Sequence, residues 1–177
     1  ERRKDVNIGP LSTILAAEAG GKTRVVLNLD KMVPYQTRID GNAIVAAEHG
    51  VVVQRIPLED VPLTRKGTIS FQVDNAMASV AAAWALTLDW NAIRAALKSF
   101  ASDAETAPGR FNVFSYRGAT LIADYGHNPD AIQALVRAVE AMPSQRRMIV
   151  ISGAGDRRDA DIRRQSEILG DAFDEVI

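Results

Sequence analysis

The sequence contains no cysteine and only two histidines, His49 and His127, in 177 residues. The lack of cysteine excludes disulfide bonds, thiolate metal sites and a cysteine nucleophile, and it is compatible with a reducing cytoplasm. No charge sign dominates, because 21 Lys and Arg residues nearly balance 22 Asp and Glu residues. A nucleic acid is therefore not a predicted partner, and any phosphate binding must be local.

Long apolar segments are lacking as well. Even the alanine-rich run from Ala76 to Leu88 is shorter than the roughly 20 residues that span a bilayer. A content of 47% hydrophobic and 24% charged residues is typical of a globular protein, so we predict a soluble, cytoplasmic protein without membrane contact. The start at Glu1 and the end inside the apolar segment 175–177 predict a piece of a larger protein, incomplete at both ends.

The first hundred residues predict a mixture of strands and helices. The run from Asp74 to Leu88 is apolar nearly all round, which predicts a buried helix. Asp89 is a suitable N-cap for a second helix that reaches about Phe100. The other expected elements are a helix at 11–19 stopped by Gly20 and Gly21, a strand at 24–29, a hairpin of 43–45 with 51–53 around Gly50, and a strand at 68–73.

The pattern changes after a small, polar segment, Ala101 to Gly109, which we interpret as an interdomain linker. Strands and helices then alternate, and this order predicts an α/β fold with a parallel, Rossmann-like sheet. The expected strands are 111–116, 120–124, 148–151 and 175–177, and the expected helices are 129–141 and 159–169.

Polar residues cluster where two of these strands end, at 124–130 and 153–159. In open α/β sheets, ligands bind beside the carboxyl ends of strands, near helix N-termini. Asp124 could accept hydrogen bonds from ribose hydroxyls or order a magnesium-bound water, or it could be a simple turn residue. His127 and Asn128 could contribute to the same pocket, or they could only start a helix, with Asn128 as N-cap and Pro129 as first residue.

Three further features bear on phosphate binding. Arg110 directly follows Pro108 and Gly109, where its guanidinium could clamp phosphate oxygens or remain a solvated linker residue. The segment 21–23, Gly-Lys-Thr, resembles the end of a P-loop, but a strand follows it and its first glycine is missing, so we predict an ordinary turn and no Walker A loop. Gly153 and Gly155 match the first two glycines of the dinucleotide-binding motif G-x-G-x-x-G, but Arg158 occupies the position of the third. This disfavours a dinucleotide-dependent oxidoreductase.

Four segments, taken together and in order, resemble the Mur ligase family: 71–78, 108–112, 124–130 and 155–159. They are closer to the branch that attaches arginine to a poly-aspartate chain than to the peptidoglycan or folate branches. The resemblance implies a partial Mur ligase central domain at 1–107, in which residues 1–40 are poorly matched. It further implies a truncated, Rossmann-like C-terminal domain at 108–177.

The resemblance also implies an activity and a site. Members of the family use ATP and Mg²⁺ to activate a carboxylate as an acyl phosphate, and an amine then displaces the phosphate. In this branch the amine of arginine joins the side-chain carboxylates of poly-aspartate, and we expect a homo-oligomer. The implied ATP contacts are Asn75 at the adenine edge, Arg110 at the phosphates, Asp124 at the ribose, and His127 and Asn128 in support of the same pocket.

No metal ligand and no catalytic residue is identified in the sequence. Because a Walker A loop is missing, we expect the chain to be inactive by itself. The alternative is a reduced, non-catalytic Mur-like domain that serves as a scaffold for oligomer formation, in a protein whose catalysis lies in an ATP-grasp domain.

Overall fold

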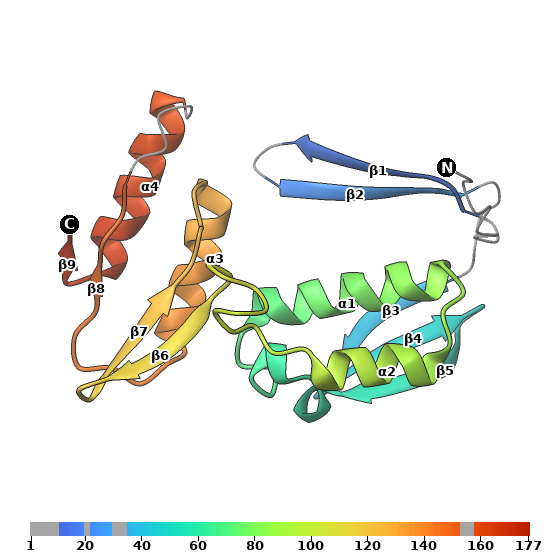
Figure 1. Ribbon diagram of the computed structural model, residues 1–177. Coiled ribbons are helices and arrows are strands. Elements are labelled where there is room, and N and C mark those ends of the chain that lie inside the picture. The colour runs from blue at the N-terminus through green and yellow to red at the C-terminus, as the bar shows by residue number, and fades with distance from the viewer. Residues whose placement is uncertain (1–10, 20–21, 30–34, 153–157) are drawn as a thin grey trace. The chain divides into compact units, whose positions relative to one another are not determined.

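The computed structural model describes residues 11–19, 22–29, 35–152 and 158–177, and its side chains are described from Gln36 onward (Figure 1). The chain divides into two compact units, with the boundary between Phe100 and Ala101. Most of the predicted polar cluster at 153–159 lies outside the described residues.

The N-terminal region contains two paired strands, β1 (Leu11–Ala19) and β2 (Lys22–Leu29). The predicted strand at 24–29 is confirmed, but the predicted helix at 11–19 is wrong. A helix of nine residues is marginal by itself, so hydrogen bonding to a neighbouring strand outweighs its weak helix propensity. Lys22 and Thr23 begin a strand, whereas the Lys and Thr of a P-loop begin a helix, so rejecting a P-loop here is consistent with the structure.

The first unit contains an antiparallel sheet in the order β3 (Tyr35–Asp40), β4 (Ala43–Glu48), β5 (Val51–Pro57). The hairpin predicted around Gly50 is confirmed. His49 and Gly50 connect its strands with φ angles of 51° and 78°. Two successive positive φ angles match the right-handed twist of the strands, which explains why glycine is favoured there.

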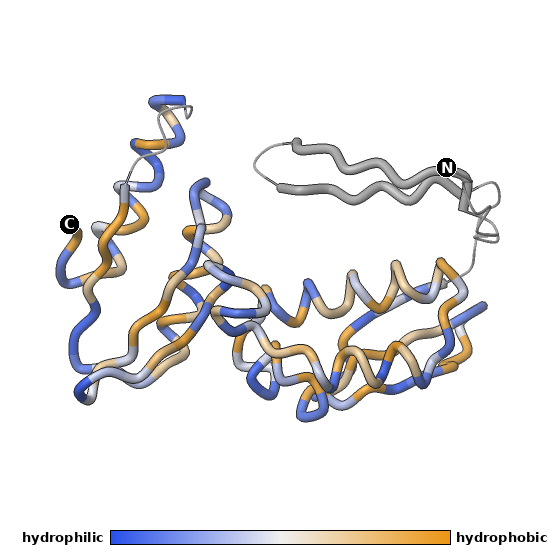
Figure 2. Tube along the Cα trace, viewed as in Figure 1, coloured by the Kyte–Doolittle hydropathy of each residue, from blue (hydrophilic) through white to orange (hydrophobic). Residues whose placement is uncertain are grey.

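Two helices, α1 (Ser70–Ala85) and α2 (Trp90–Ser99), complete the first unit after two short 3₁₀ turns, η1 (Leu58–Asp60) and η2 (Pro62–Thr64). The strand predicted at 68–73 is wrong, because α1 already begins at Ser70. Its apolar residues recur at helical spacing and join one core with residues of β4 and β5 (Figure 2). That core contains Ile44, Ala46, Ile56, Leu58, Val61, Val73, Ala76, Val80, Trp84 and Ile93.

Helix α1 is buried on one face only, which corrects the expectation of burial nearly all round. Asp74, Asn75 and Ser79 are exposed on the other face. Helix α2 begins as predicted, because the Asp89 side chain accepts hydrogen bonds from the backbone N–H groups of Asn91 (2.8 Å) and Ala92 (3.4 Å).

The second unit begins with a hairpin of β6 (Asn112–Tyr116) and β7 (Ala119–Ala123), followed by α3 (Pro129–Glu140). Next come β8 (Met148–Ile149), α4 (Asp159–Ala172) and β9 (Glu175–Val176). Strands β8 and β9 pair in parallel, and the α/β class is confirmed. The helices pack over β8 through a core of Ile132, Val136, Ile168 and Leu169 with Ile149 and Ile151.

Strands β6 and β7 are antiparallel, which corrects part of the prediction of a parallel sheet. Their connection is the two-residue turn Arg117-Gly118, with φ angles of 49° and 82°. A turn of two residues can only join antiparallel strands, since parallel strands need a long crossover.

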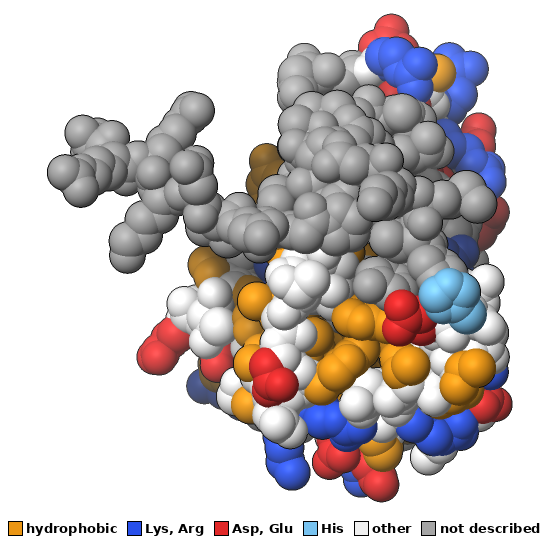
Figure 3. Space-filling view, turned by 90° about the vertical axis from the view of Figure 1, so that its right-hand side faces the viewer, with side chains coloured by type: hydrophobic (Ala, Val, Ile, Leu, Met, Phe, Trp, Pro, Cys, Tyr) orange, Lys and Arg blue, Asp and Glu red, His pale blue; other side chains and the backbone are white. Residues whose placement is uncertain are grey.

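In the described part of the chain, every helix is too short or too polar to cross a bilayer. The same residues contain no group of three or more His, Cys, Asp or Glu side chains arranged to hold a metal ion. Figure 3 shows apolar, basic and acidic side chains intermingled on the face that it draws, which agrees with the balanced charge of the sequence.

Candidate functional site

The predicted site residues are divided between the two units. Asn75 lies on the exposed face of α1 in the first unit, where its side-chain amide donates to Gln72 Oε1 (3.0 Å). Arg110, Asp124, His127 and Asn128 lie in the second unit, in the loops before β6 and between β7 and α3. It stays a prediction that Asn75 and these four residues bind the same nucleotide.

The Asp124 carboxylate joins these two loops. Its Oδ2 accepts a hydrogen bond from the backbone N–H of Phe111 (2.9 Å), and its Oδ1 accepts one from the N–H of Gly126 (2.6 Å). Each carboxylate oxygen can accept more than one hydrogen bond, so a ligand hydroxyl remains chemically acceptable at this exposed residue. Asp124 is therefore a turn residue, as one interpretation predicted, and this role is compatible with ligand binding.

Asn112, which sequence reasoning did not single out, holds the loop before β6 in place. Its buried side chain accepts from the N–H of Gly109 (2.7 Å) and donates to the carbonyls of Ser102 (3.2 Å) and Ala107 (3.0 Å). The N–H of Tyr125 donates to the Gly109 carbonyl (2.9 Å) and ties the same loop to the one after β7. Arg110 thus stands between two residues whose backbone is fixed.

Phe111 has an unusual backbone conformation beside Arg110. Its φ angle is +54°, and the residue is buried, with only 4% of its surface exposed. A positive φ angle is strained for a bulky residue and costs about 1–3 kcal/mol. Burial of the ring and the hydrogen bond to Asp124 oppose this cost, and backbone strain of this kind is frequent at functional sites.

The aromatic ring of Tyr125 contacts two side chains of the predicted site. The Arg110 guanidinium carbon lies 5.9 Å from the centre of this ring. The His127 ring lies 5.0 Å from it, centre to centre, with a tilt of 55°. Tyr125 is 65% exposed, so these contacts lie at the surface. Tyr125 was not predicted as a site residue, although it directly follows Asp124.

His127 has a defined orientation. Its Nδ1 contacts the Tyr125 carbonyl oxygen (3.0 Å), and because a carbonyl only accepts, Nδ1 carries the proton in this contact. Its own carbonyl accepts a hydrogen bond from Nε2 of Gln165, a buried residue of α4 (2.9 Å). The Nε2 atom of the His127 ring is therefore available to accept a hydrogen bond from a ligand.

Asn128 caps α3, as the structural interpretation of this residue predicted. Its side-chain oxygen accepts from the N–H of Ala131 (2.9 Å), and Pro129 is the first helical residue. A contribution of Asn128 to ligand binding stays a prediction.

The segment that leads to Arg110 is ordered by Asp103. Its carboxylate accepts from the N–H groups of Glu105 (3.0 Å) and Thr106 (2.6 Å). Hydrogen bonds from Thr106 to the charged form hold the pKa of Asp103 below its ordinary value.

Comparisons with known proteins identify the relatives of this region. Residues 109–177 match the Mur ligase, glutamate ligase domain. A cyanophycin synthetase of Crocosphaera subtropica is 31% identical over 95% of this chain and 20% of its own length, and one of Synechocystis sp. is 36% identical over 66% and 13%. The resemblance to the Mur ligase family is confirmed. The chain spans only about a fifth or less of the length of these cyanophycin synthetases.

Solved structures agree on the Mur ligase-like fold. A structure of E. coli FolC in complex with DHPP and ADP matches with a TM-score of 0.57 at 24% identity, over 81% of this chain and 31% of that chain. Folylpolyglutamate synthase of Thermotoga maritima matches with a TM-score of 0.50 at 23% identity, over 81% and 32%. At this level of identity the likeness concerns the fold.

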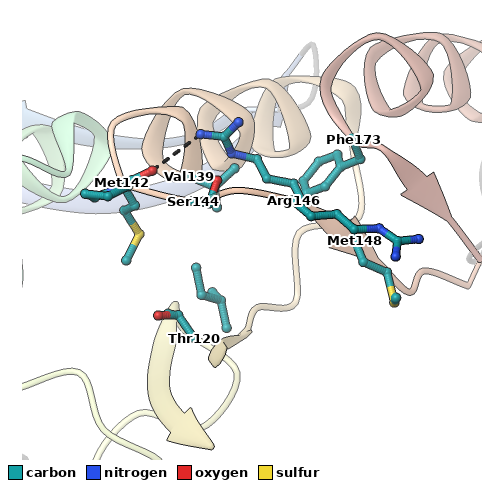
Figure 4. Close-up of a pocket in the computed structure, with 10 residues that line it drawn as sticks. Thr120, Val139, Met142, Ser144, Arg146, Met148 and Phe173 are labelled. Carbon is teal, nitrogen blue, oxygen red and sulfur yellow. Dashed lines mark hydrogen bonds between the residues drawn. The ribbon is translucent and has the colours of Figure 1, made fainter. Parts of the chain in front are cut away.

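A small hollow of about 140 Å³ lies elsewhere in the second unit, between β7, the end of α3 and the start of β8 (Figure 4). Thr120, Met142, Met148 and Phe173 contribute to its lining, and Arg147 donates to the Met142 carbonyl there (3.4 Å). The hollow adjoins the C-terminal end of α3, whereas Asp124, His127 and Asn128 precede its N-terminal end. It contains none of the predicted site residues.

Proposed function

We propose that this chain forms part of the ATP site of a cytoplasmic, ATP-dependent amide ligase of the cyanophycin synthetase type. The proposed enzyme joins arginine to the side-chain carboxylates of a poly-aspartate backbone and works as a homo-oligomer. One observation carries the proposal. Arg110, Asp124 and His127 gather in one hydrogen-bonded pair of loops, inside the segment that matches the Mur ligase, glutamate ligase domain.

Each residue of this cluster has chemistry that suits one part of ATP. The Arg110 guanidinium offers charge-assisted hydrogen bonds to phosphate oxygens. The Asp124 carboxylate accepts hydrogen bonds from ribose hydroxyls, and His127 offers Nε2 to the same ligand. Asn128 begins α3 beside them, so the N-terminal end of the helix, which carries a partial positive charge, lies at the site.

Asn75 is proposed for the adenine edge, because a side-chain amide both donates and accepts, as the edge of adenine does. In the proposed reaction the aspartate carboxylate attacks the terminal phosphate of ATP, giving an acyl phosphate and ADP. The amine of arginine then attacks the acyl carbon and expels phosphate, which leaves an amide bond. Mg²⁺ is proposed to accompany the triphosphate and offset its charge.

The proposal is tested by MgATP binding to the full chain, measured by ligand-observed saturation-transfer NMR, which is suited to weak binding. We expect saturation transfer to the adenine protons in the wild type and a loss of at least about tenfold in affinity in Arg110→Ala, since a charge-assisted contact contributes about 1.5–3 kcal/mol. Arg117→Ala is the matched control, because Arg117 stacks on Tyr116 in the β6–β7 turn. Equal affinities in wild type and Arg110→Ala contradict the proposal.

The second candidate is a non-catalytic scaffold that holds an oligomer together. It is favoured by the segment around Lys22, because strand β2 begins at this lysine, whereas the lysine of a P-loop begins a helix. A defined oligomer in light scattering, combined with no binding of MgATP at millimolar concentration, would support the scaffold over the ligase.

A further inference from the structure

We infer that Tyr125 is a positioning residue, whose ring holds the Arg110 guanidinium ready for the phosphates of the bound nucleotide. This inference rests on the proposed function and adds a residue to that site. Its basis is the contacts of the Tyr125 ring with Arg110 and His127, in the loops that Asp124 joins.

The backbone of both loops is fixed by hydrogen bonds. Tyr125 donates its N–H to the Gly109 carbonyl (2.9 Å), and Asp124 accepts from the next residue on each loop, Phe111 and Gly126. A Cβ at position 126 would lie 2.9 Å from Asp124 Oδ1, so a larger residue there would displace the carboxylate that accepts from the Gly126 N–H. The Cα atom of Tyr125, from which the ring extends, is therefore held at a constant place relative to the Cα atom of Arg110.

An exposed arginine side chain is otherwise free to adopt many rotamers, and ordering it costs free energy on binding. A guanidinium over an aromatic face is attracted by the ring electrons, which narrows this freedom before the ligand arrives. The contact leaves the N–H groups around the guanidinium edge able to donate in the plane, where a phosphate or a carboxylate accepts. Tyr125 thus acts through Arg110, and it acts on the phosphates rather than on the nucleoside.

The test compares Tyr125→Leu, which removes the aromatic face, with Tyr125→Phe, which keeps it, in the full chain. The matched control is Tyr116→Leu, because Tyr116 carries an equivalent stack with Arg117 (5.1 Å) away from the site. Binding of MgATP and of adenosine is measured separately by saturation-transfer NMR. The mobility of the Arg110 side chain is measured without ligand, as the ¹⁵N order parameter of its Nε–H group.

We expect Tyr125→Leu to weaken MgATP binding about two- to fivefold, which is the value of an exposed cation–π contact, and to leave adenosine binding unchanged. Tyr125→Phe and Tyr116→Leu keep the wild-type affinity for MgATP. In the Arg110→Ala background, Tyr125→Leu has no additional effect. The order parameter of Arg110 falls in Tyr125→Leu and is retained in Tyr125→Phe.

Unchanged MgATP affinity and an unchanged Arg110 order parameter in Tyr125→Leu overturn the inference. Equal losses for MgATP and adenosine overturn it too, because the ring would then act on the nucleoside or on the fold. If the wild type binds no MgATP while the order parameter still falls in Tyr125→Leu, the proposed function fails and the positioning of Arg110 stands.

Discussion

Replacement of Asp124 by alanine is expected to destabilise the second unit without affecting the first. The change removes the acceptors of two backbone N–H groups, those of Phe111 (2.9 Å) and Gly126 (2.6 Å). A hydrogen bond to a charged group contributes about 1.5–3 kcal/mol, but water can replace the acceptor of the exposed Gly126 bond, so we expect a loss of about 2–3 kcal/mol. Phe111 also loses a bond that holds its strained φ angle of +54°.

The two units can be followed separately during unfolding in urea. Both tryptophans, Trp84 and Trp90, belong to the first unit, so tryptophan fluorescence reports on that unit alone. The amide resonances of α3 and α4 report on the second unit. With a urea dependence of about 1–1.5 kcal/mol per molar for a unit of this size, the midpoint of the second unit should fall by about 1.3–3 M.

Two further variants serve as controls for this prediction. Asp124→Asn keeps the shape and one acceptor oxygen but points an amide N–H at a backbone N–H, so we expect a loss of about 1–2 kcal/mol. Asp171→Ala, at an exposed position of α4, should stay within about 0.5 kcal/mol of the wild type. The reasoning is refuted if the second unit of Asp124→Ala unfolds at the same urea concentration as that of the wild type. It is also refuted if the midpoint reported by tryptophan fluorescence falls while the midpoint of the second unit does not.

Further predictions concern single side chains. Asn128→Ala should destabilise the second unit by about 1 kcal/mol through loss of the α3 N-cap, measured by the same urea titration. Asp89→Ala should cost the first unit a similar amount, visible in tryptophan fluorescence, because it caps α2. Because the pKa of Asp103 is lowered in the folded protein, its carboxylate contributes its full stabilisation of the fold above the ordinary pKa of 3.8. This stabilisation is lost as the pH falls through the lowered pKa. The N–H resonance of Thr106 should therefore titrate with a midpoint below 3.8, and a midpoint at or above that value contradicts the bond.

The resemblance to the Mur ligase family rests on ordered short motifs, and the structure explains why the motif at 124–130 is informative. Asp124, Asn128 and Pro129 all lie within it, so the turn after β7 and the cap of α3 are local events. Local hydrogen bonds depend on neighbouring residues, which a sequence displays directly. The caps of α2 and α3 and the hairpin around Gly50 were predicted correctly for the same reason.

Other features depended on residues that are distant in the sequence. The segment 11–19 is a strand because β2 pairs with it, and α1 begins at Ser70 because its apolar face packs on a sheet. The bond from Phe111 to Asp124 joins residues 13 positions apart, and the ring of Tyr125 reaches Arg110 only through that junction. The capping residues of α2 and α3 and the turn at Gly50 were determined by the sequence itself, because their hydrogen bonds are local. The choice between strand and helix, and the grouping of site residues, were decided by tertiary contacts, whose energies no short stretch of sequence contains.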